Sequence, residues 1–511
     1  RISAIRRLES APDRFLIPGF VDAHVHVESS MLPPTEFARL AVRHGTVATV
    51  SDPHEIANVL GVEGVNFMID NARHTPFKFC FGAPSCVPAT DFETAGARLD
   101  VNAVADLLAR PEIGYLSEVM NWPGVLAGDA DMLGKIAVAK ALGKPVDGHA
   151  PGLRGADAAK YAAAGIETDH ECYTLDEALD KIAAGMLIAI REGSAARNFA
   201  ALEPLLKSHP DRCMLCCDDI HPDSLVVGHI EKLVARAVTG GADVFDVLWA
   251  ACAKPVEHYH LSVGLLRVGD AADFAVVENL TNFRVLETWI AGQCVARDGV
   301  SLLPSVEVTP LNRFGASVID VSQLRVPATT GAVHVIEALD GQLITGHLEL
   351  EMVAEGGFVP ADPERDILKI AVVNRYADAP PAVGFIRGFG LRHGAIASSV
   401  AHDSHNVVAV GASDECLCRA INHVIASRGG VCATDGSDDR LLPLEIAGLM
   451  SVLDGDVVAE RYAEVADFAR SLGSPLRDAF MTLSFMALLV IPDLKMSDRG
   501  LFSGKRFEFV K

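Results

Sequence analysis

The feature that most constrains the fold is an alternation of short apolar segments with longer amphipathic ones between residues 20 and 254. The apolar segments are rich in β-branched residues and have strand length, while the others have helical periodicity. The predicted strands are 20–27, 46–51, 77–82, 113–118, 144–149, 165–170, 186–191 and 213–218. The predicted helices are 35–44, 55–74, 101–109, 129–142, 154–164, 175–185, 196–208 and 228–252. Repeated strand–helix units over ~250 residues predict an α/β fold with a (β/α)8 barrel, whose chemistry lies at the carboxyl ends of the strands.

The first predicted strand ends in two histidines. Pro18-Gly19 forms a turn signal, and the apolar run that follows contains His24 and His26. Residues i and i+2 of a strand point to the same side, so both imidazoles can bind one metal ion. The alternative is a pair of core histidines that are satisfied by ordinary hydrogen bonds.

Nearly every other predicted strand end carries a residue that can bind a metal or transfer a proton. These residues are Asp52, His54, Glu55, Glu118, His149, His170, Glu171, Arg191, Glu192, Asp218 and Asp219. A purely structural role for the whole set is hard to sustain, because unpaired buried charge is costly. We therefore expect them to converge on one site.

Two divalent metal ions fit this set better than one. We expect His24, His26 and Asp218 to bind the first ion, and His149 and His170 the second. Glu118 would bridge the two ions with one oxygen each. Histidine and carboxylate ligands without thiolate suit zinc, iron(II) or manganese, and paired ions lower the pKa of a shared water.

Four nearby residues have more than one interpretation. Asp218 can also accept a proton as a general base, whereas Asp219 is expected on the loop because strand neighbours alternate in direction. Asp52 could cap the following helix, or instead carry a proton or contact substrate. Glu171 is a candidate for catalysis and for a hydrogen bond to substrate, or it could instead form a salt bridge at the barrel rim. Arg191 is a candidate substrate contact, although an ion pair with Glu192 is the commoner arrangement.

The flanks of the barrel predict two further units. Residues 1–18 and 261–305 have strand and turn character and could form a small β-domain built from both flanks of a barrel over 19–260. Residues 306–511 mix strands (368–374, 407–411) with helices (414–427, 456–470) and predict a C-terminal α+β domain.

Composition excludes several classes of partner. The formal net charge is −23, so neither nucleic acid nor an anionic membrane surface is expected as a partner. No apolar run is long enough to span a bilayer, and no signal peptide opens the chain. The 11 cysteines suggest no disulfide framework, and the pair Cys213 and Cys216 is expected to be strand core rather than a zinc site. We expect a cytoplasmic homodimer, with some N-terminal sequence missing before Arg1.

The ordered motifs resemble the amidohydrolase superfamily and, within it, the adenine deaminase family. The resemblance rests on His24–Met31, Ser51–Val59, Ser117–Asn121, Gly148–Gly152, Asp169–Glu171, Arg191–Ser194 and Asp218–Asp219. Beyond the barrel it rests on His402–Asn406, Pro443–Met450 and Ile491–Lys495. The resemblance implies a binuclear centre of manganese or iron(II), with zinc as the alternative, in which Glu118 takes the bridging place that many relatives give to a modified lysine.

The implied reaction is hydrolytic deamination of adenine to hypoxanthine and ammonia. The barrel rim alone is equally compatible with another amino-heterocycle or a cyclic amide as substrate. A non-catalytic metal-binding scaffold is the third hypothesis. His402 and His405 could form a second metal site, although a loop or interface role is expected for them.

Overall fold

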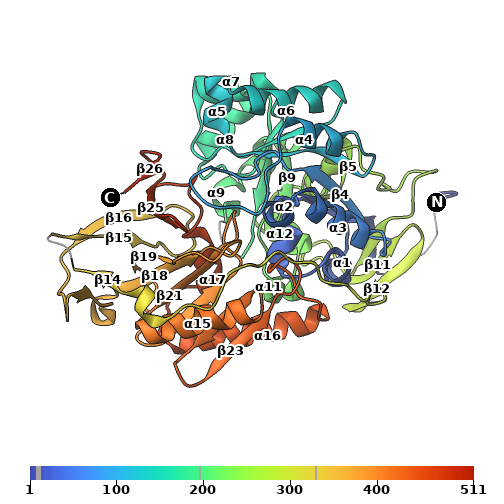
Figure 1. The fold of residues 1–511 in the computed structure, drawn as a ribbon. Helices are drawn as coiled ribbons and strands as arrows, with labels where there is room; N and C mark the ends of the chain where they lie inside the picture. Colours follow the sequence, from blue (N-terminus) through green and yellow to red (C-terminus); the bar gives the residue numbers. More distant parts are fainter. Residues whose placement is uncertain (7–12, 195–196, 329–330, 511) are drawn as a thin grey trace.

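A computed structural model describes residues 1–6, 13–194, 197–328 and 331–510 (Figure 1). Its central feature is a set of eight strands that pair in parallel with their sequence neighbours, in two sheets of five and three strands. The strands are β2 (Phe20–Val25), β3 (Thr46–Ser51), β4 (Lys78–Ala83), β5 (Ile113–Val119), β6 (Val146–Gly148), β7 (Thr168–Asp169), β8 (Leu187–Arg191) and β9 (Cys213–Cys216).

Backbone hydrogen bonds close these two sheets into a barrel. Glu167 N donates to Val146 O at 2.9 Å and so joins the β6 and β7 edges. At the opposite seam, His26 N donates to Asp218 O at 3.1 Å, and Asp218 N donates to His24 O at 2.9 Å. The predicted (β/α)8 barrel is confirmed.

Each observed strand overlaps its predicted segment. β6 and β7 are shorter than the predicted 144–149 and 165–170. Pro145 lacks the N–H that a strand ladder needs, and Gly165 has φ +119, outside the strand region.

Helices connect the strands and cover the barrel. They are α1 (Pro34–Ala41), α2 (His54–Leu60), α3 (Val62–Ala72), α4 (Val101–Leu108), α5 (Trp122–Ala127), α6 (Ala130–Ala141), α7 (Gly155–Ala164), α8 (Leu175–Ala183), α9 (Phe199–Leu202), α10 (Leu205–Ser208), α11 (Pro222–Val227), α12 (Ile230–Thr239), α13 (Val244–Leu248) and α14 (Lys254–His258).

Two long helices predicted from periodicity are broken in the structure. The 55–74 segment forms α2 and α3, because Gly61 adopts φ +63 and ψ −142 between them. In the 228–252 segment the first helix, α12, ends at Thr239, and Gly241 just after it has φ +89. Both glycines take backbone conformations that other residues rarely adopt. Residue 196, at the start of the predicted 196–208 helix, lies outside the described residues.

A small antiparallel sheet joins the two flanks of the barrel. Its order is β1 (Phe15–Pro18), β10 (Phe274–Val277), β11 (Val285–Ile290), β12 (Gln293–Arg297) and β13 (Val300–Ser301). Phe15 pairs with Val277, so chain segments more than 200 residues apart are neighbours. Residues 7–12 of the predicted small domain lie outside the described part of the chain.

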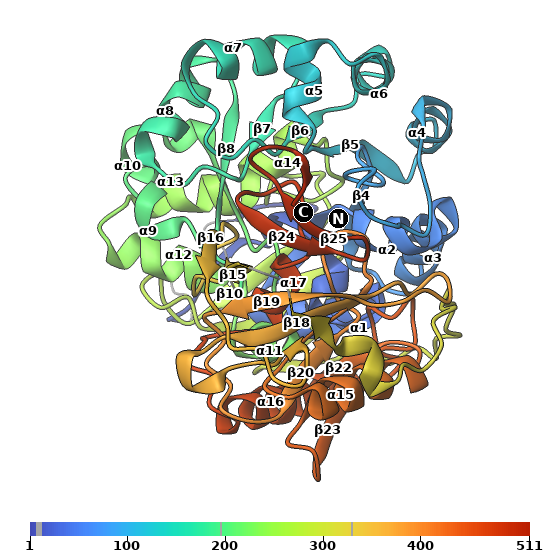
Figure 2. The same cartoon turned by 60° about the vertical axis from the view of Figure 1, so that its left-hand side comes forward.

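The C-terminal unit contains a mixed sheet with three principal helices (Figure 2). The sheet order is β16 (Gly346–Leu350), β15 (Val333–Glu337), β19 (Ala382–Arg387), β18 (Leu368–Val373), β21 (Val407–Gly411), β20 (Ala395–Ser398), β22 (Gly430–Thr434) and β23 (Asp439–Pro443). The helices are α15 (Asp414–Ala426), α16 (Gly455–Ser471) and α17 (Ala479–Phe485). A short pair, β14 (Val326–Pro327) and β17 (Phe358–Val359), and a small sheet of β24 (Leu494–Ser497), β25 (Gly500–Ser503) and β26 (Glu508–Phe509) complete the unit.

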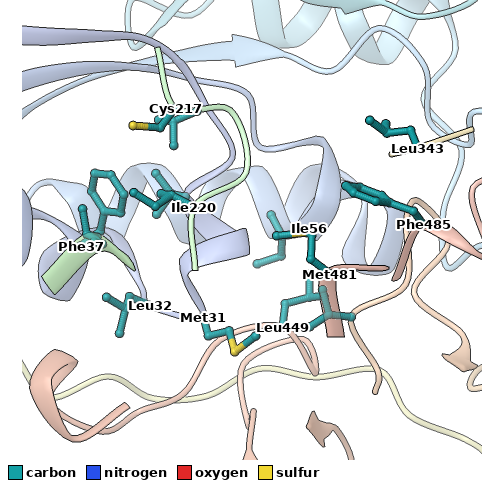
Figure 3. Packing of buried hydrophobic residues seen from close by; sticks show 14 of the residues in the cluster. Met31, Leu32, Phe37, Ile56, Cys217, Ile220, Leu343, Leu449, Met481 and Phe485 are labelled. Atoms are coloured by element: carbon teal, nitrogen blue, oxygen red, sulfur yellow. The ribbon is translucent and has the colours of Figure 1, made fainter. Parts of the chain in front are cut away.

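The C-terminal unit packs against the barrel through a continuous apolar core. Figure 3 shows Met31 next to Leu449, and Ile56 above Met481. Ser451 N also donates to Met31 O at 2.9 Å. The C-terminal unit therefore lies against the same loops that follow β2 and β3, where the predicted site is located. Among the described residues, no helix has both the length and the hydrophobicity to cross a bilayer.

Candidate metal centre and catalytic pocket

His24 and His26 are buried at the end of β2, and their side chains meet inside the barrel. Their Nε2 atoms lie 3.3 Å apart. A shared proton or a shared cation is needed to bring two imidazole nitrogens this close. The placement agrees with the strand alternation that suggested a common ligand role.

Asp218 follows β9 and faces both histidines across the barrel seam. Its Oδ1 lies 3.2 Å from His26 Nε2 and 3.5 Å from His24 Nε2. Burial alone would raise the pKa of Asp218, but the Arg191 guanidinium and the two histidines lower it well below its ordinary value. The carboxylate is therefore held in its charged form.

Glu118, near the end of β5, contacts both halves of the histidine set. Its Oε1 lies 3.5 Å from His26 Nε2, while its Oε2 lies 2.7 Å from His149 Nδ1 and 3.1 Å from His170 Nε2. Burial opposes ionisation of Glu118, yet His149 and His170 lower its pKa well below the ordinary value. One oxygen on each side is the arrangement required of a bridging carboxylate.

This donor set fits divalent cations. It contains four imidazoles and two carboxylates with no thiolate, a combination that suits zinc, iron(II) or manganese. His149 Nε2 is buried and, among the described residues, has no hydrogen-bond partner. His170 stacks on His24 with ring centroids 4.0 Å apart, so the residues expected for the two ions form one continuous group.

Arg191 lies behind this group and binds two carboxylates. Its Nη1 lies 2.5 Å from Glu171 Oε1, its Nη2 lies 3.0 Å from Glu171 Oε2, and Nη1 also contacts Asp218. The expected ion pair with Glu192 is wrong. Glu192 instead accepts a hydrogen bond from Arg236 at 3.0 Å, because neighbouring strand residues point to opposite sides.

Asp52 and His54 form a hydrogen-bonded pair at the end of β3. Asp52 accepts hydrogen bonds from His54 N and from His54 Nδ1, both at 3.1 Å. His54 Nδ1 also lies 3.3 Å from Glu118 Oε1. Asp52 thus both supports the first turn of α2 and orients the imidazole, and His54 rather than Asp52 borders the pocket.

Asp219 borders the pocket, but in the described residues it forms no ion pair with His24 or His26, and its Oδ1 lies 3.9 Å from His402 Nε2. Its Oδ1 accepts a 2.5 Å hydrogen bond from Ser29 Oγ. Asp218 is therefore the member of the pair with an oxygen facing His24 and His26. Cys213 and Cys216 are buried free thiols in β9.

Residues of the C-terminal unit complete the pocket. Glu55 of α2 pairs with His402 and hydrogen-bonds His405. Burial disfavours charged His402, but Glu55 raises its pKa to about 9. The full lining comprises His26, His54, Glu55, Glu118, Met120, His149, His170, Glu171, Arg191, Asp218, Asp219, Leu343, His402, Asp403, Phe485 and Leu488.

The contribution of the C-terminal residues to this pocket was missed from the sequence. The segment His402–Asn406 carried a signal, since it was among the motifs of the resemblance, but its histidines suggested only an interface or a separate metal site. They do lie at an interface, and His402 also borders the pocket. Nothing in the sequence indicated that Phe485 borders the pocket, because a phenylalanine in an apolar helix is typical of the hydrophobic core.

Comparison with known proteins gives matches over the whole chain. The amidohydrolase family profile matches residues 15–295, and the profile of the adenine deaminase C-terminal domain matches residues 342–508. An adenine deaminase from Salinibacter ruber is 58% identical over 511 residues, covering 100% of this chain and 94% of that protein. One from Sulfurovum sp. is 56% identical over 513 residues, with 100% and 94% covered. A solved dihydropyrimidinase from Brevibacillus agri is 13% identical with a TM-score of 0.44, covering 58% of this chain and 89% of that one.

Proposed function

Since the chain belongs to the adenine deaminase family of the amidohydrolases, we propose that it hydrolyses adenine to hypoxanthine and ammonia at the pocket between the barrel and the C-terminal unit. The observation that carries the proposal is the full-length identity to adenine deaminases, together with a buried four-histidine, two-carboxylate cluster at the barrel mouth. Family members use divalent metal.

We propose that two divalent cations bind here, with His24, His26 and Asp218 around one and His149 and His170 around the other. Glu118 would bridge them, which its two oxygens facing opposite halves of the cluster support. When bound, the cations would activate water for attack at neutral pH. Manganese or iron(II) is the proposed pair, and zinc is the alternative.

Asp218 is proposed as the general base. Arg191 engages its Oδ2, which leaves Oδ1 directed at the histidines, where attacking water would be bound. The water oxygen adds to C6 of adenine, and the first water proton passes to Asp218. The second proton leaves the C6 hydroxyl as the C6 carbonyl forms. These two protons are delivered to a ring nitrogen and to the 6-amino group, the C6–N6 bond breaks, and ammonia leaves.

Glu171 is the proposed proton carrier to the purine ring. It borders the pocket, and Arg191 fixes both of its oxygens. Arg191 is accordingly proposed to act on substrate through Glu171 rather than by direct contact. Asp52 is proposed as a positioning residue, because His54 stands between it and the pocket.

The experiment is incubation of the metal-loaded protein with adenine while ammonia, hypoxanthine and metal content are measured. We expect equimolar ammonia and hypoxanthine, with two cations per chain. Turnover of other amino-heterocycles or cyclic amides, without turnover of adenine, would overturn the proposal.

We also propose that the protein is a cytoplasmic homodimer acting on a small molecule rather than on nucleic acid or membrane. The 11 free cysteines support a reducing location. The net charge of −23 weighs against polyanionic partners. Light scattering of the purified protein tests the dimer, and a monomer mass would exclude it.

A further inference from the structure

One wall of the pocket comes from the C-terminal unit and differs in character from the barrel side. Leu343, Phe485 and Leu488 are 4%, 2% and 6% exposed and all border the pocket. Except for Met120, the barrel contributes only polar and charged residues to the lining. The chemistry of the two sides suits a flat heteroaromatic ring, with its reacting edge toward the histidines and its remainder against hydrocarbon.

Phe485 supplies an aromatic surface on this wall. Its ring lies 5.4 Å from that of His402, at an interplanar angle of 31°. Figure 3 shows Phe485 beside Leu343. Offset stacking on an aromatic ring favours a planar base over a flexible substrate of similar size.

Lys495 of β24 holds this wall from behind. Its buried Nζ donates to Leu343 O at 2.5 Å and to Phe485 O at 2.9 Å. Through these two hydrogen bonds, Lys495 connects the loop that contains Leu343 to the end of α17. The apolar wall is therefore fixed before substrate binds, which reduces the entropy lost on binding.

Two polar atoms on the same wall lack partners. His402 Nε2 and Asp403 Oδ2 are buried and have no hydrogen-bond partner within the described ranges. The other oxygen of Asp403 lies 3.7 Å from His54 Nε2. A buried acceptor without a donor is costly, so a ligand that brings an N–H to it offsets part of that cost.

We propose that the C-terminal unit forms the base-recognition half of the site. Phe485 packs against the face of the purine, and Asp403 accepts the N–H of its five-membered ring. The proposal rests on the proposed function and adds the residues that recognise the base. A nucleoside lacks that N–H and would place a sugar against the wall, so it is excluded.

The test compares Asp403→Ala and Phe485→Ala with wild type and with His423→Ala, a control on the half-exposed side of α15. Binding of hypoxanthine is measured by calorimetry, KM and kcat are measured for adenine and adenosine, and metal content is measured for each protein. We expect hypoxanthine affinity to fall and KM for adenine to rise about 10-fold or more in both variants. Metal content should be the same in all the proteins, and His423→Ala should bind hypoxanthine and turn over adenine as wild type does. Wild type should leave adenosine intact.

The proposal would be overturned if both variants bound hypoxanthine with the affinity of wild type and had the same KM for adenine. Equal turnover of adenosine and adenine by wild type would also overturn it. If the alanine variants do not fold, Asp403→Asn and Phe485→Leu decide by the same measurements. A wild-type protein that binds hypoxanthine but releases no ammonia from adenine would refute the proposed reaction. The binding comparison would still decide the role of the wall.

Discussion

At the scale of single residues, Asp218 divides its two oxygens between different tasks. Oδ1 faces His24 and His26, and Oδ2 is held by Arg191. An asparagine keeps the shape and a coordinating oxygen but cannot accept a proton. We expect Asp218→Asn to retain metal while kcat falls by about 10²–10⁴, as for a lost general base.

Metal analysis and steady-state kinetics check this expectation. Asp211→Asn, on the exposed segment before β9, is the matched control and should behave as wild type. Near-normal turnover by metal-replete Asp218→Asn would remove the residue from the role of base.

Lys495 gives a prediction about pH. Burial lowers its pKa from 10.5 to about 7, and its side-chain partners are the backbone carbonyls of Leu343 and Phe485. The unfolded chain therefore binds one more proton than the folded chain between about pH 7 and 10, so the stability contributed by this residue rises with pH across that window.

Lys495→Met should lack this rise. Chemical denaturation of both proteins at pH 7 and pH 9 measures it, and the wild-type free energy of unfolding should gain about 2 kcal/mol relative to the variant. A difference that stays constant with pH would show that Lys495 keeps an ordinary pKa in the folded chain.

At the scale of elements, a buried polar network joins α11 of the barrel to α16 and α17. His221 Nδ1 lies 2.8 Å from Asp478 Oδ2, and Tyr462 Oη donates to Asp478 Oδ1 at 3.0 Å. Asp478 also caps α17 by accepting from Met481 N. Burial would raise the pKa of Asp478, but His221 lowers it to about 2.

The lowered pKa makes this junction sensitive to acid. Its stabilisation is complete above the unfolded value near 4 and is lost as pH falls through that value toward 2. Asp478→Asn keeps the cap but removes the charge. In metal-free protein at pH 6 it should lower the free energy of unfolding by about 1–3 kcal/mol, and this deficit should shrink below pH 4.

Thermal melts of metal-free wild type and Asp478→Asn at several pH values test this prediction. Asp467→Asn, exposed on α16, is the control. A deficit that is the same at pH 6 and pH 3.5 would mean that the charge of Asp478 does not stabilise the junction.

The barrel strands could be predicted because each is an apolar run bounded by turn residues, as β3 at Thr46–Ser51 shows. The alternation of side chains then placed His24 and His26 correctly. The local sequence pattern gave wrong predictions where the structure depends on the backbone conformation of one residue or on a partner distant in the sequence. Gly61 breaks a helix through its positive φ, and Arg191 selects Glu171 from another strand end. Phe485 reaches the pocket only through tertiary packing.

At the scale of the whole molecule, the cluster gathers four imidazoles and two carboxylates, a donor set that suits divalent cations. His24 and His26 face each other at 3.3 Å, and Glu118 and Asp218 both approach His26. Cations that bind the folded chain alone stabilise it in proportion to the logarithm of their concentration over Kd. Exhaustive chelation should therefore lower Tm by several degrees.

Calorimetry before and after chelation measures this shift, and re-addition of manganese should restore Tm. His24→Ala, which removes one proposed ligand, should melt at a temperature that responds less to manganese. A wild-type Tm that is indifferent to chelator and to added metal would contradict a cation pair in the folded protein.

The seam between His24, His26 and Asp218 also has a consequence for a chain that is still being synthesised. The first and last strands of the barrel are tied there by two backbone hydrogen bonds, although almost two hundred residues separate them along the chain. A nascent polypeptide that has emerged only as far as β8 holds five of its six proposed ligands but lacks the one that locks the seam. The full set of proposed ligands is therefore assembled only once β9 has joined β2, so we expect complete cation binding to follow closure of the barrel.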